Sequence, residues 1–338
     1  MTGTTQTVTP CLVRSLGSTT VPVEEGEKRG RLIFTSVVFP SKSSETNALL
    51  LVESIRTFAG SFSQLPIWCL TPECAKQLSA NVKNRLLALN IRLIRFKIDH
   101  ETLRFPFAGE VIATALAESM SCGKTDFLAW LGTNTVVIQE PKDFLLQDGK
   151  NLGFRPVHHT LVGSRYEEPV DPFWTLIYRY CNVPKDRIFP MMTHVDKTRI
   201  RPYFNAGLLV TRPEKHLLRT WRDTFFKIYQ EPSFQELYHQ DKRYKIFVHQ
   251  AVLSGVILST FATDEIQELP PRYNYPLHLH VEDITDHRPT CLEELVTFRH
   301  ERFYEDPEWM NKMPAREPLK KWIAERLAHT KKTDWLTK

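Results

Sequence analysis

The chain has 338 residues, of which 42% are hydrophobic and 25% charged, the composition of an ordinary globular protein with a sizeable core. Its formal net charge is only +5. This charge is compatible with a small anionic substrate but too weak for a nucleic-acid-binding surface, and no stripe of interleaved basic and aromatic residues occurs. We therefore expect no nucleic-acid partner.

The six cysteines are scattered and form no Cys-x-x-Cys pair, which is typical of buried thiols in a reducing compartment. The N-terminus shows no signal-peptide pattern. The most apolar window, residues 246–262, is interrupted by His249, Gln250 and Gly255, so it suits a buried helix better than a membrane span. These features predict a soluble, cytoplasmic protein without a transmembrane segment.

Residues 1–29 are rich in Thr, Ser, Val and Gly and show no helical period, which predicts a flexible N-terminal tail. The folded body begins at Arg31, and the apolar run Leu32–Phe39 predicts a strand buried on both faces. Helices and strands then alternate, and Thr71-Pro72-Glu73 is interpreted as a helix start. We expect helices over 45–59, 71–89 and 109–120, and strands over 66–70, 91–96 and 127–131. This alternation predicts a parallel sheet covered on both faces, with ligands at the carboxyl ends of its strands.

The second half of the chain is less regular. We expect strands over 152–157 and 203–211, helices over 212–229 and 247–258, and an extended Pro-rich segment over 269–276. A basic amphipathic helix over 319–328 closes the pattern, with Leu319, Trp322, Ile323 and Leu327 on one face. We expect this helix to pack on the domain or on a partner subunit, which would allow a homo-oligomer, rather than on a membrane surface.

Three motifs do not carry the chemistry that they suggest. Gly123-Lys124-Thr125 lacks the earlier glycine of a phosphate-binding loop and ends a helix instead of opening one. No Gly-x-Gly-x-x-Gly occurs, which argues against a dinucleotide-binding enzyme. His278-x-His280 could place two imidazoles on one strand face as metal ligands, but without a clear third ligand we favour polar positions on a loop near a sheet edge.

Four segments carry a resemblance to a known family. In chain order they are Phe127–Pro141 with Gly132-Thr133-Asn134, Tyr203–Pro213 with Asn205-Ala206-Gly207, His249-Gln250-Ala251, and Leu269–Asn274. They resemble the glycosyltransferases of the GT-A fold, in which a buried strand ends in Asp-x-Asp and is followed by Phe-Asn-x-Gly, Asp-Gln and Leu-Pro-x-x-Tyr-Asn segments. The resemblance spans about Arg31 to His300.

The resemblance implies an α/β fold with a GT-A-like (Rossmann-like), mostly parallel central sheet flanked by helices. It implies one large domain over 30–330, with a nucleotide-binding half over about 30–150, an acceptor half over about 151–310 and a C-terminal helix over about 317–329. No internal repeat suggests a second independent domain.

The resemblance also implies a nucleotide-sugar donor lying across the carboxyl ends of the first four strands. Thr35 and Ser36 would lie near the base, with Gly132, Thr133 and Asn134 beneath the diphosphate. Asn205, Ala206 and Gly207 would line the donor-sugar and acceptor cleft, because glycine allows close approach and asparagine can both donate to and accept from a sugar hydroxyl. The alternative is that Asn205 and Gly207 only shape a turn. We assign catalysis to Asn205, His249 and Gln250, and by residue type alone further acid–base candidates are His194, Asp196 and Glu110.

The main departure from the family lies in the Asp-x-Asp motif, which holds a divalent cation on the donor diphosphate. Gly132 and Asn134 occupy its two positions, and no other Asp-x-Asp occurs. We therefore expect no metal site and no cofactor, with cationic side chains binding the diphosphate instead. The substrate-binding candidates are Arg272, Asn274, Arg299 and His300, with Arg155 and Arg201 as further cations. These arginines would otherwise be ordinary surface salt-bridge partners.

Three functions remain open at this point. The leading hypothesis is a glycosyltransferase that moves a sugar from a nucleotide-sugar donor to an unknown acceptor without a metal held by Asp-x-Asp. The alternative is an inactive GT-A-like scaffold that acts as a binding or assembly subunit, which the missing aspartates fit equally well. The third is another reaction of an activated sugar or phosphate on the same fold.

Overall fold

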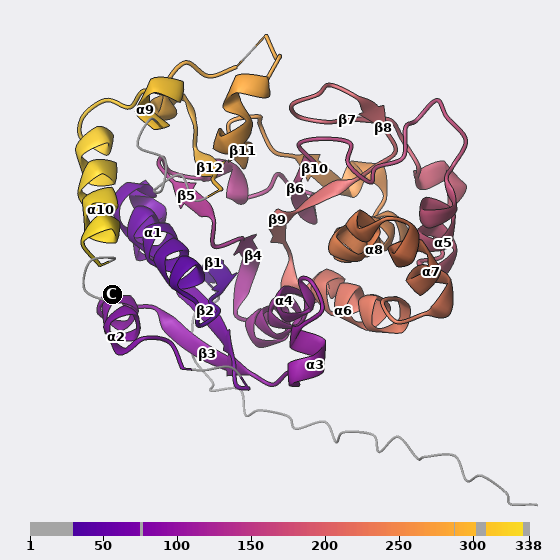
Figure 1. Ribbon diagram of the computed structural model, residues 1–338, viewed down its shortest axis with the longest axis horizontal. Helices are drawn as coiled ribbons and strands as arrows, with labels where there is room; N and C mark the ends of the chain where they lie inside the picture. Colours follow the sequence, from indigo (N-terminus) through magenta and orange to yellow (C-terminus); the bar gives the residue numbers. More distant parts are fainter. Residues whose placement is uncertain (1–29, 75–76, 287, 302–308, 334–338) are drawn as a thin grey trace, which may run out of the picture.

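The computed structural model describes residues 30–74, 77–286, 288–301 and 309–333. The predicted N-terminal tail lies outside these residues. A seven-stranded sheet with the strand order β10-β6-β9-β4-β1-β2-β3 forms the centre of the molecule (Figure 1). Its strands, in chain order, are β1 Gly30–Val37, β2 Ile67–Pro72, β3 Arg92–Phe96, β4 Thr125–Leu131, β6 Leu152–Pro156, β9 Phe204–Thr211 and β10 Ile266–Glu268.

One strand sets the geometry of the whole sheet. β9 runs antiparallel to both β4 and β6, whereas every other neighbouring pair is parallel. The mostly parallel sheet of the prediction is confirmed. Because β9 is reversed, its first residues lie at the same sheet edge as the carboxyl ends of β4 and β6, where parallel sheets bind ligands.

Helices cover both faces of the sheet, and the alternating residues of β1 show why. Leu32 and Phe34 pack into the cluster beneath α1 Lys42–Phe58 and α2 Ala80–Ala88. Ile33 and Val37 pack into the opposite cluster, which is covered by α4 Ala108–Ser121, α5 Pro172–Tyr180, α6 Leu217–Ile228, α7 Pro232–Gln240 and α8 Lys242–Thr260. A strand with both faces buried is what the continuous apolar run predicts.

Two smaller sheets complete the fold. β7 Met191–Met192 pairs with β8 Arg199–Ile200. β12 Thr297–Arg299 pairs with β11 Tyr275–Pro276 and, antiparallel, with β5 Thr135–Val137. In this register Arg299 lies opposite Thr135. The late segment of the chain is thereby returned to the turn that follows β4.

The predicted helix start at Thr71-Pro72 is wrong. Both residues continue β2, in register with Arg95 and Phe96 of β3. The helix begins at Ala80, where the Ser79 hydroxyl accepts from the amide of Val82 and caps it. Pairing along the neighbouring strand therefore outweighs the local Thr-Pro signal. The turn at Gly123 is as predicted, because α4 ends at Ser121 and β4 begins at Thr125.

Other boundaries differ from the prediction in the second half. Pro213–Lys215 forms a short 3-10 turn, and α6 begins only at Leu217. α8 begins at Lys242, so His249 and Gln250 lie inside the helix and not at its head. The sequence pattern missed α5 and α7, and it also missed the short strands β7, β8, β10 and β12. β11 lies in the segment that we expect to be extended.

The C-terminal helix α10, Leu319–Thr333, lies along α1 (Figure 1). Trp322 contacts Phe58 edge to face, with ring centroids 5.2 Å apart, and Arg326 Nε lies 2.7 Å from Glu53 Oε2. Packing on the domain is confirmed for Leu319, Trp322 and Ile323, whereas the side chain of Leu327 lies outside the described part. A homo-oligomer through α10 would have to use the side of the helix that faces away from α1.

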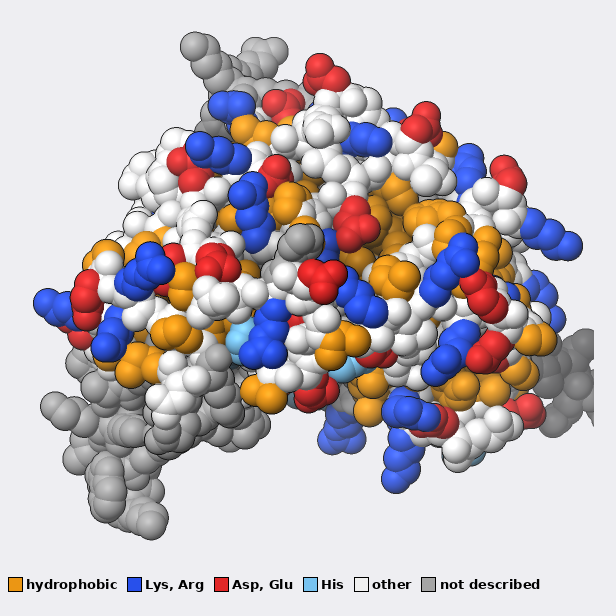
Figure 2. Space-filling model, turned by 90° about the horizontal axis from the view of Figure 1, so that it is seen from above, with side chains coloured by type: hydrophobic (Ala, Val, Ile, Leu, Met, Phe, Trp, Pro, Cys, Tyr) orange, Lys and Arg blue, Asp and Glu red, His pale blue; other side chains and the backbone are white. Residues whose placement is uncertain are grey.

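Surface charges are mixed. Figure 2 shows Lys and Arg side chains interspersed with Asp and Glu over the face that it presents. Within the described residues, no helix is both long enough and apolar enough to cross a membrane. The cysteines at 69, 74, 122, 181 and 291 are free thiols.

Candidate functional site

A cleft of about 420 Å³ opens at the carboxyl ends of β1 and β4. It is bounded by the starts of α1 and α4, the middle of α8, the start of β9, and β12 with the residues after it. We call it the cleft. Its lining includes Phe39, Ser43, Ser44, Asn47, Phe107, Glu110, Trp130, Gly132, Thr133, Asn134, Ala206, Gly207, Trp221, Phe247, His249, Gln250, Arg299, His300 and Glu301. Nine of the predicted site residues meet here, from four separate segments.

The floor of the cleft is the Gly132-Thr133-Asn134 turn. The amide of Gly132 donates to the carbonyl oxygen of Gly207 (2.8 Å). The carbonyl oxygen of Gly132 in turn accepts from the amide of Thr135 (3.0 Å). The amide of His300 donates to the carbonyl oxygen of Asn134 (3.0 Å). These bonds join β4, β9 and the segment after β12 into one backbone unit, which is the preorganisation that a ligand site needs.

Arg299 is the cation of this floor. Its Nη1 donates to Asn205 Oδ1 (3.1 Å), and the same oxygen accepts from the amide of Gly207 (2.9 Å). A Cβ on Gly207 would lie 2.5 Å from Arg299 Nη1, so glycine is what allows the guanidinium to lie against the backbone. Burial lowers the pKa of Arg299, but a guanidinium stays charged at any physiological pH. Within the described part of the chain, Arg299 makes no ion pair, and its Nε has no hydrogen-bond partner.

Two imidazoles line the cleft in neutral form. Burial, with a further contribution from the charge of Arg299, lowers the pKa of His300 to about 3. Burial likewise lowers the pKa of His249 to about 3. His249 Nδ1 lies 2.9 Å from the carbonyl oxygen of Ile246, so Nδ1 carries the proton and Nε2 is left as an acceptor. At neutral pH such a ring can accept a hydrogen bond from a ligand hydroxyl, but it is a weak base.

Phe107 is the most exposed aromatic side chain of the cleft. It is 41% exposed and stacks on His249, with ring centroids 4.1 Å apart. It caps α4 with a left-handed backbone (φ 61°), which is unusual for a bulky residue and strained. The backbone conformation thus holds an aromatic face towards the opening.

Gln250 and Asn205 hold the start of β9. Gln250 Oε1 accepts from the amide of Ala206 (2.9 Å), and Asn205 Oδ1 orients Gly207 and Arg299 as described. Both side chains therefore position backbone and cation.

Glu110, in the first turn of α4, is the group of the cleft that titrates near neutrality. Burial raises the pKa of its carboxyl to about 7. A carboxyl that holds its proton at neutral pH can both donate to and accept from sugar hydroxyls, and it has a pKa suited to general acid–base chemistry.

Four of the predicted binding residues are not in the cleft. Thr35 and Ser36 are buried within β1, where Ser36 Oγ donates to the carbonyl oxygen of Leu131 (2.6 Å). Since a two-sided buried strand turns both side chains into the core, Phe39 beyond its end reaches the cleft in their place. Asn274 is buried and lines neither cavity described here. Arg272 is exposed and pairs with Asp143 (3.0 Å).

Of the acid–base candidates named by residue type, Glu110 lines the cleft, whereas His194 and Asp196 lie elsewhere, as do the further cations Arg155 and Arg201. Arg155 and His194 line a second cavity. Arg201 donates to the carbonyl oxygen of Glu168 and to Ser164 Oγ, and Asp196 accepts from Thr160. His278 and His280 belong to a 3-10 helix, Leu277–Glu282, whose geometry separates positions i and i+2.

The residues present do not fit the divalent cation that the GT-A resemblance implies. Gly132 has no ligand atom and Asn134 offers only an amide, whereas hard cations prefer carboxylates. The charge of Arg299 in the same cleft opposes a bound cation. Among the described residues, no three His, Cys, Asp or Glu side chains are grouped so that they could hold a metal.

Several residues that line the cleft were not among the predicted site residues. Ser43 and Ser44 follow a buried strand and open a helix, a pattern that predicts backbone amides facing a ligand. Phe107, Trp130, Trp221 and Phe247 come from four elements and carry no local signal.

Comparison with known proteins identifies the family of the chain. The sequence profile of the Rhodobacterales glycosyltransferase domain matches residues 35–260, and no curated protein matches the chain in sequence. Among solved structures, galactosyltransferase LgtC is 14% identical, with a TM-score of 0.47 over 88% of this chain and 95% of its own. Mouse xyloside xylosyltransferase 1 is 10% identical, with a TM-score of 0.44 over 80% and 97%. GlyE of Streptococcus pneumoniae TIGR4 is 14% identical, with a TM-score of 0.42 over 89% and 60%.

These structural resemblances are distant, and the assignment rests on the sequence profile. It covers two thirds of the chain and contains the end of β1 together with α4, β4, β9 and α8, the elements that build most of the cleft. The chain therefore belongs to the Rhodobacterales glycosyltransferase domain family, and it is a glycosyltransferase with a mixed α/β fold.

Proposed function

We propose that the cleft binds a nucleotide-sugar donor without a divalent cation, and that Arg299 takes over the charge neutralisation of the diphosphate. The observation that carries this proposal is the exchange of charge at one place. Neutral Gly132 and Asn134 stand where the family's aspartates would hold a cation. The Arg299 guanidinium lies in the same cleft, where it feels the charge of Glu301 but makes no ion pair with any described residue.

The geometry supports further roles for the cleft residues. The α1 helix begins at Lys42 and presents Ser43 and Ser44 to the cleft, and a helix N-terminus favours a phosphate. The exposed face of Phe107 suits stacking on the base or on a sugar ring. In the transfer step, Arg299 would stabilise the negative charge that develops on the leaving diphosphate, and such stabilisation is a large term in group transfer.

Asn205 and Gln250 would act as positioning residues. They fix the start of β9 and the guanidinium through the contacts described above. His249 Nε2, a neutral acceptor, would bind a hydroxyl of the donor sugar. The acid–base group with a suitable pKa is Glu110.

A panel of nucleotide sugars, each incubated with the protein in chelator and in Mn²⁺, tests the proposal through release of the nucleoside diphosphate. We expect release from one donor class in both conditions. Release only with Mn²⁺ would refute the metal-free site, whereas the absence of both release and nucleotide binding would favour the non-catalytic scaffold.

A further inference from the structure

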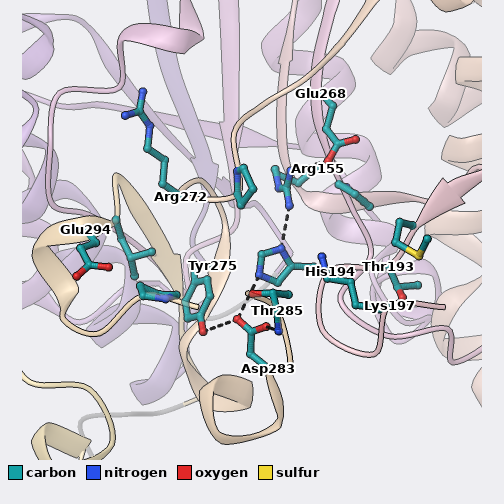
Figure 3. Close-up of a pocket in the computed structure, with 15 residues that line it drawn as sticks. Arg155, Thr193, His194, Lys197, Glu268, Arg272, Tyr275, Asp283, Thr285 and Glu294 are labelled. Carbon is teal, nitrogen blue, oxygen red and sulfur yellow. Dashed lines mark hydrogen bonds and ion pairs between the residues drawn. The ribbon is translucent and has the colours of Figure 1, made fainter. Parts of the chain in front are cut away.

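A second cavity, of about 200 Å³, lies at the carboxyl ends of β6 and β10. We call it the second pocket. It is drawn in Figure 3, and its lining includes Arg155, Pro156, Met192, His194, Lys197, Glu268, Pro271, Arg272, Tyr275, Asp283, Thr285, Glu294 and Leu295. It shares no lining residue with the cleft. The cavity is far larger than the 10–15 Å³ or so that one water needs.

The floor of the second pocket is a buried polar network. Arg155 Nη1 donates to Glu268 Oε1 and to the carbonyl oxygen of Leu269 (both 2.7 Å), and Nη2 donates to His194 Nδ1 (2.8 Å). On the other side, Asp283 Oδ1 accepts from the amide of Thr285, and Oδ2 accepts from the Tyr275 hydroxyl, both at 2.9 Å. Arg155, His194, Tyr275 and Asp283 are all more than nine-tenths buried.

One donor of this network has no acceptor. Because a guanidinium can only donate, His194 Nδ1 is an acceptor, and the proton of the neutral ring must be on Nε2. Burial and the nearby charge of Arg155 lower the pKa of His194 to about 4, which keeps the ring neutral. Nε2 is buried without a hydrogen-bond partner among the described residues, and Asp283 Oδ2 lies 3.9 Å away (Figure 3). That distance is too long for a direct hydrogen bond.

The gap has the geometry of a hydroxyl site. An oxygen about 2.8 Å from both Nε2 and Oδ2 would lie beside the line that joins them. Because Nε2 has almost no exposed surface, the side chains around it must move slightly to admit that oxygen. A hydroxyl there would accept from His194 Nε2 and donate to the Asp283 carboxylate, so both buried groups would be satisfied. A carboxylate or phosphate oxygen could accept from His194, but it would be repelled by Asp283.

The charges of the wall are balanced and so favour a neutral ligand over an ionic one. The lining includes three basic side chains (Arg155, Lys197 and Arg272) and three acidic ones (Glu268, Asp283 and Glu294). The rest of the wall is largely apolar, with Pro156, Pro271, Tyr275 and Leu295. Apolar walls with a few fixed polar groups are typical of small-molecule sites, and a neutral sugar, with hydroxyls on its edge and C–H groups on its faces, matches this pattern.

We infer that the second pocket binds a neutral sugar unit, with one hydroxyl between His194 and Asp283. His158 connects the second pocket to the residues that orient Arg299. Its ring centroid is 6.3 Å from that of His194, and its Nε2 is 3.4 Å from Nδ2 of Asn205, whose Oδ1 accepts from Arg299. A sugar unit of the acceptor would therefore lie next to the transfer site. That identification rests on the proposed function, whereas sugar binding itself does not.

The test uses the full-length protein and a panel of neutral methyl glycosides and disaccharides, with binding measured by saturation-transfer NMR and titration calorimetry. We expect at least one sugar to bind. His194→Asn keeps an acceptor near the position of Nδ1 for Arg155 but removes Nε2, and it should weaken binding at least tenfold. Met192→Trp, a change at an exposed rim residue (46% exposed), should do the same without touching the network. Val170→Trp, on a side chain that lines neither cavity, is the matched control and should bind like the wild type.

Nucleotide-sugar titrations on the same variants separate sugar binding in the second pocket from nucleotide-sugar binding in the cleft. Both pocket variants should bind the donor within twofold of the wild type, and Arg299→Ala should bind the sugar panel normally. If no sugar binds, or if both pocket variants bind as the wild type does, the pocket holds only water and the inference is wrong. If sugars bind but no nucleotide does, the proposed function fails alone. Mass spectrometry after incubation with the nucleotide sugar then shows whether the bound sugar is an acceptor, since only an acceptor gains the mass of the transferred sugar.

Discussion

Two arginines at the same edge of the sheet are buried in different ways. Arg155 in the second pocket is matched by a carboxylate, a backbone carbonyl and an imidazole nitrogen. Arg299 in the cleft has one amide oxygen, and its Nε is unpaired within the described residues. Arg299 is only partly buried, and the nearby charge of Glu301 offsets part of the cost of removing the guanidinium from water. We therefore interpret Arg155 as a structural element, whereas we propose that Arg299 binds an anion.

The largest expected effect is on donor binding. Arg299→Ala removes a charge-assisted contact worth about 1.5–3 kcal/mol, so nucleotide-sugar affinity should fall ten- to a hundredfold. The melting temperature should change little, because Arg299 is partly exposed and makes no ion pair with a described residue. Titration calorimetry and thermal unfolding check the two parts. Unchanged affinity would show that the anion is bound elsewhere.

Arg155 should give the opposite pattern. Arg155→Met leaves the carbonyl oxygen of Leu269 and His194 Nδ1 without a donor, at about 1–3 kcal/mol each. We expect the free energy of unfolding, measured by urea denaturation, to fall by several kcal/mol. The affinity for the nucleotide sugar should be unchanged. Arg272→Met is the control: its ion pair with Asp143 is half-exposed and should contribute less than about 1 kcal/mol. Equal losses in the two variants would contradict the distinction.

Gly207→Ala sharpens the comparison without removing a charge. The new Cβ would lie 2.5 Å from Arg299 Nη1, so the flexible guanidinium should move away from the turn. Donor affinity should fall about three- to tenfold, that is by about 0.6–1.4 kcal/mol. Gly30→Ala, whose Cβ meets only ordinary contacts, is the matched control. A wild-type affinity for Gly207→Ala would mean that the position of Arg299 is not critical.

The smallest expected effect is on pH dependence. Because burial raises the pKa of Glu110 to about 7, its charge appears as the pH rises through 7 and repels the diphosphate. Donor affinity should therefore rise a few-fold from pH 8 to pH 6, and Glu110→Gln should be flat. His249 and His300, with a pKa of about 3, do not titrate in this window.

The same shift has a consequence for stability. The folded protein binds the Glu110 proton more tightly than the unfolded chain does. The stability that this difference contributes is therefore fully present below about pH 4.5 and is lost as the pH rises through 7. Glu110→Gln should therefore be more stable than the wild type at pH 8, as denaturation curves would show. A pH dependence of affinity that survives in Glu110→Gln would assign it to another group.

The sequence predicted the parts of the fold whose signals are local. The apolar run of β1 and the helix α4 are predictable because two-sided burial and helical periodicity are visible in a short window. The Gly132-Thr133-Asn134 segment is identified only through the family resemblance. Thr71-Pro72 misled because strand pairing outweighed a local helix signal. Arg272 and Arg299 looked equivalent in sequence. Only the pairing of β12 with β5, in which Arg299 lies opposite Thr135, places Arg299 in the cleft, and these two residues are far apart in the sequence. The pairing of His194 with Asp283 is equally non-local, so the second pocket could not be anticipated.

The central claim is that diphosphate binding in the cleft needs Arg299 and no divalent ion. The most direct measurement is titration of a nucleotide-sugar panel into the wild-type protein, once in EDTA and once in Mn²⁺. We expect at least one nucleotide sugar to bind with a Kd that is equal within twofold in the two buffers. This Kd should increase with salt, as expected of a charge-assisted contact. Binding that appears only with Mn²⁺ would contradict the claim.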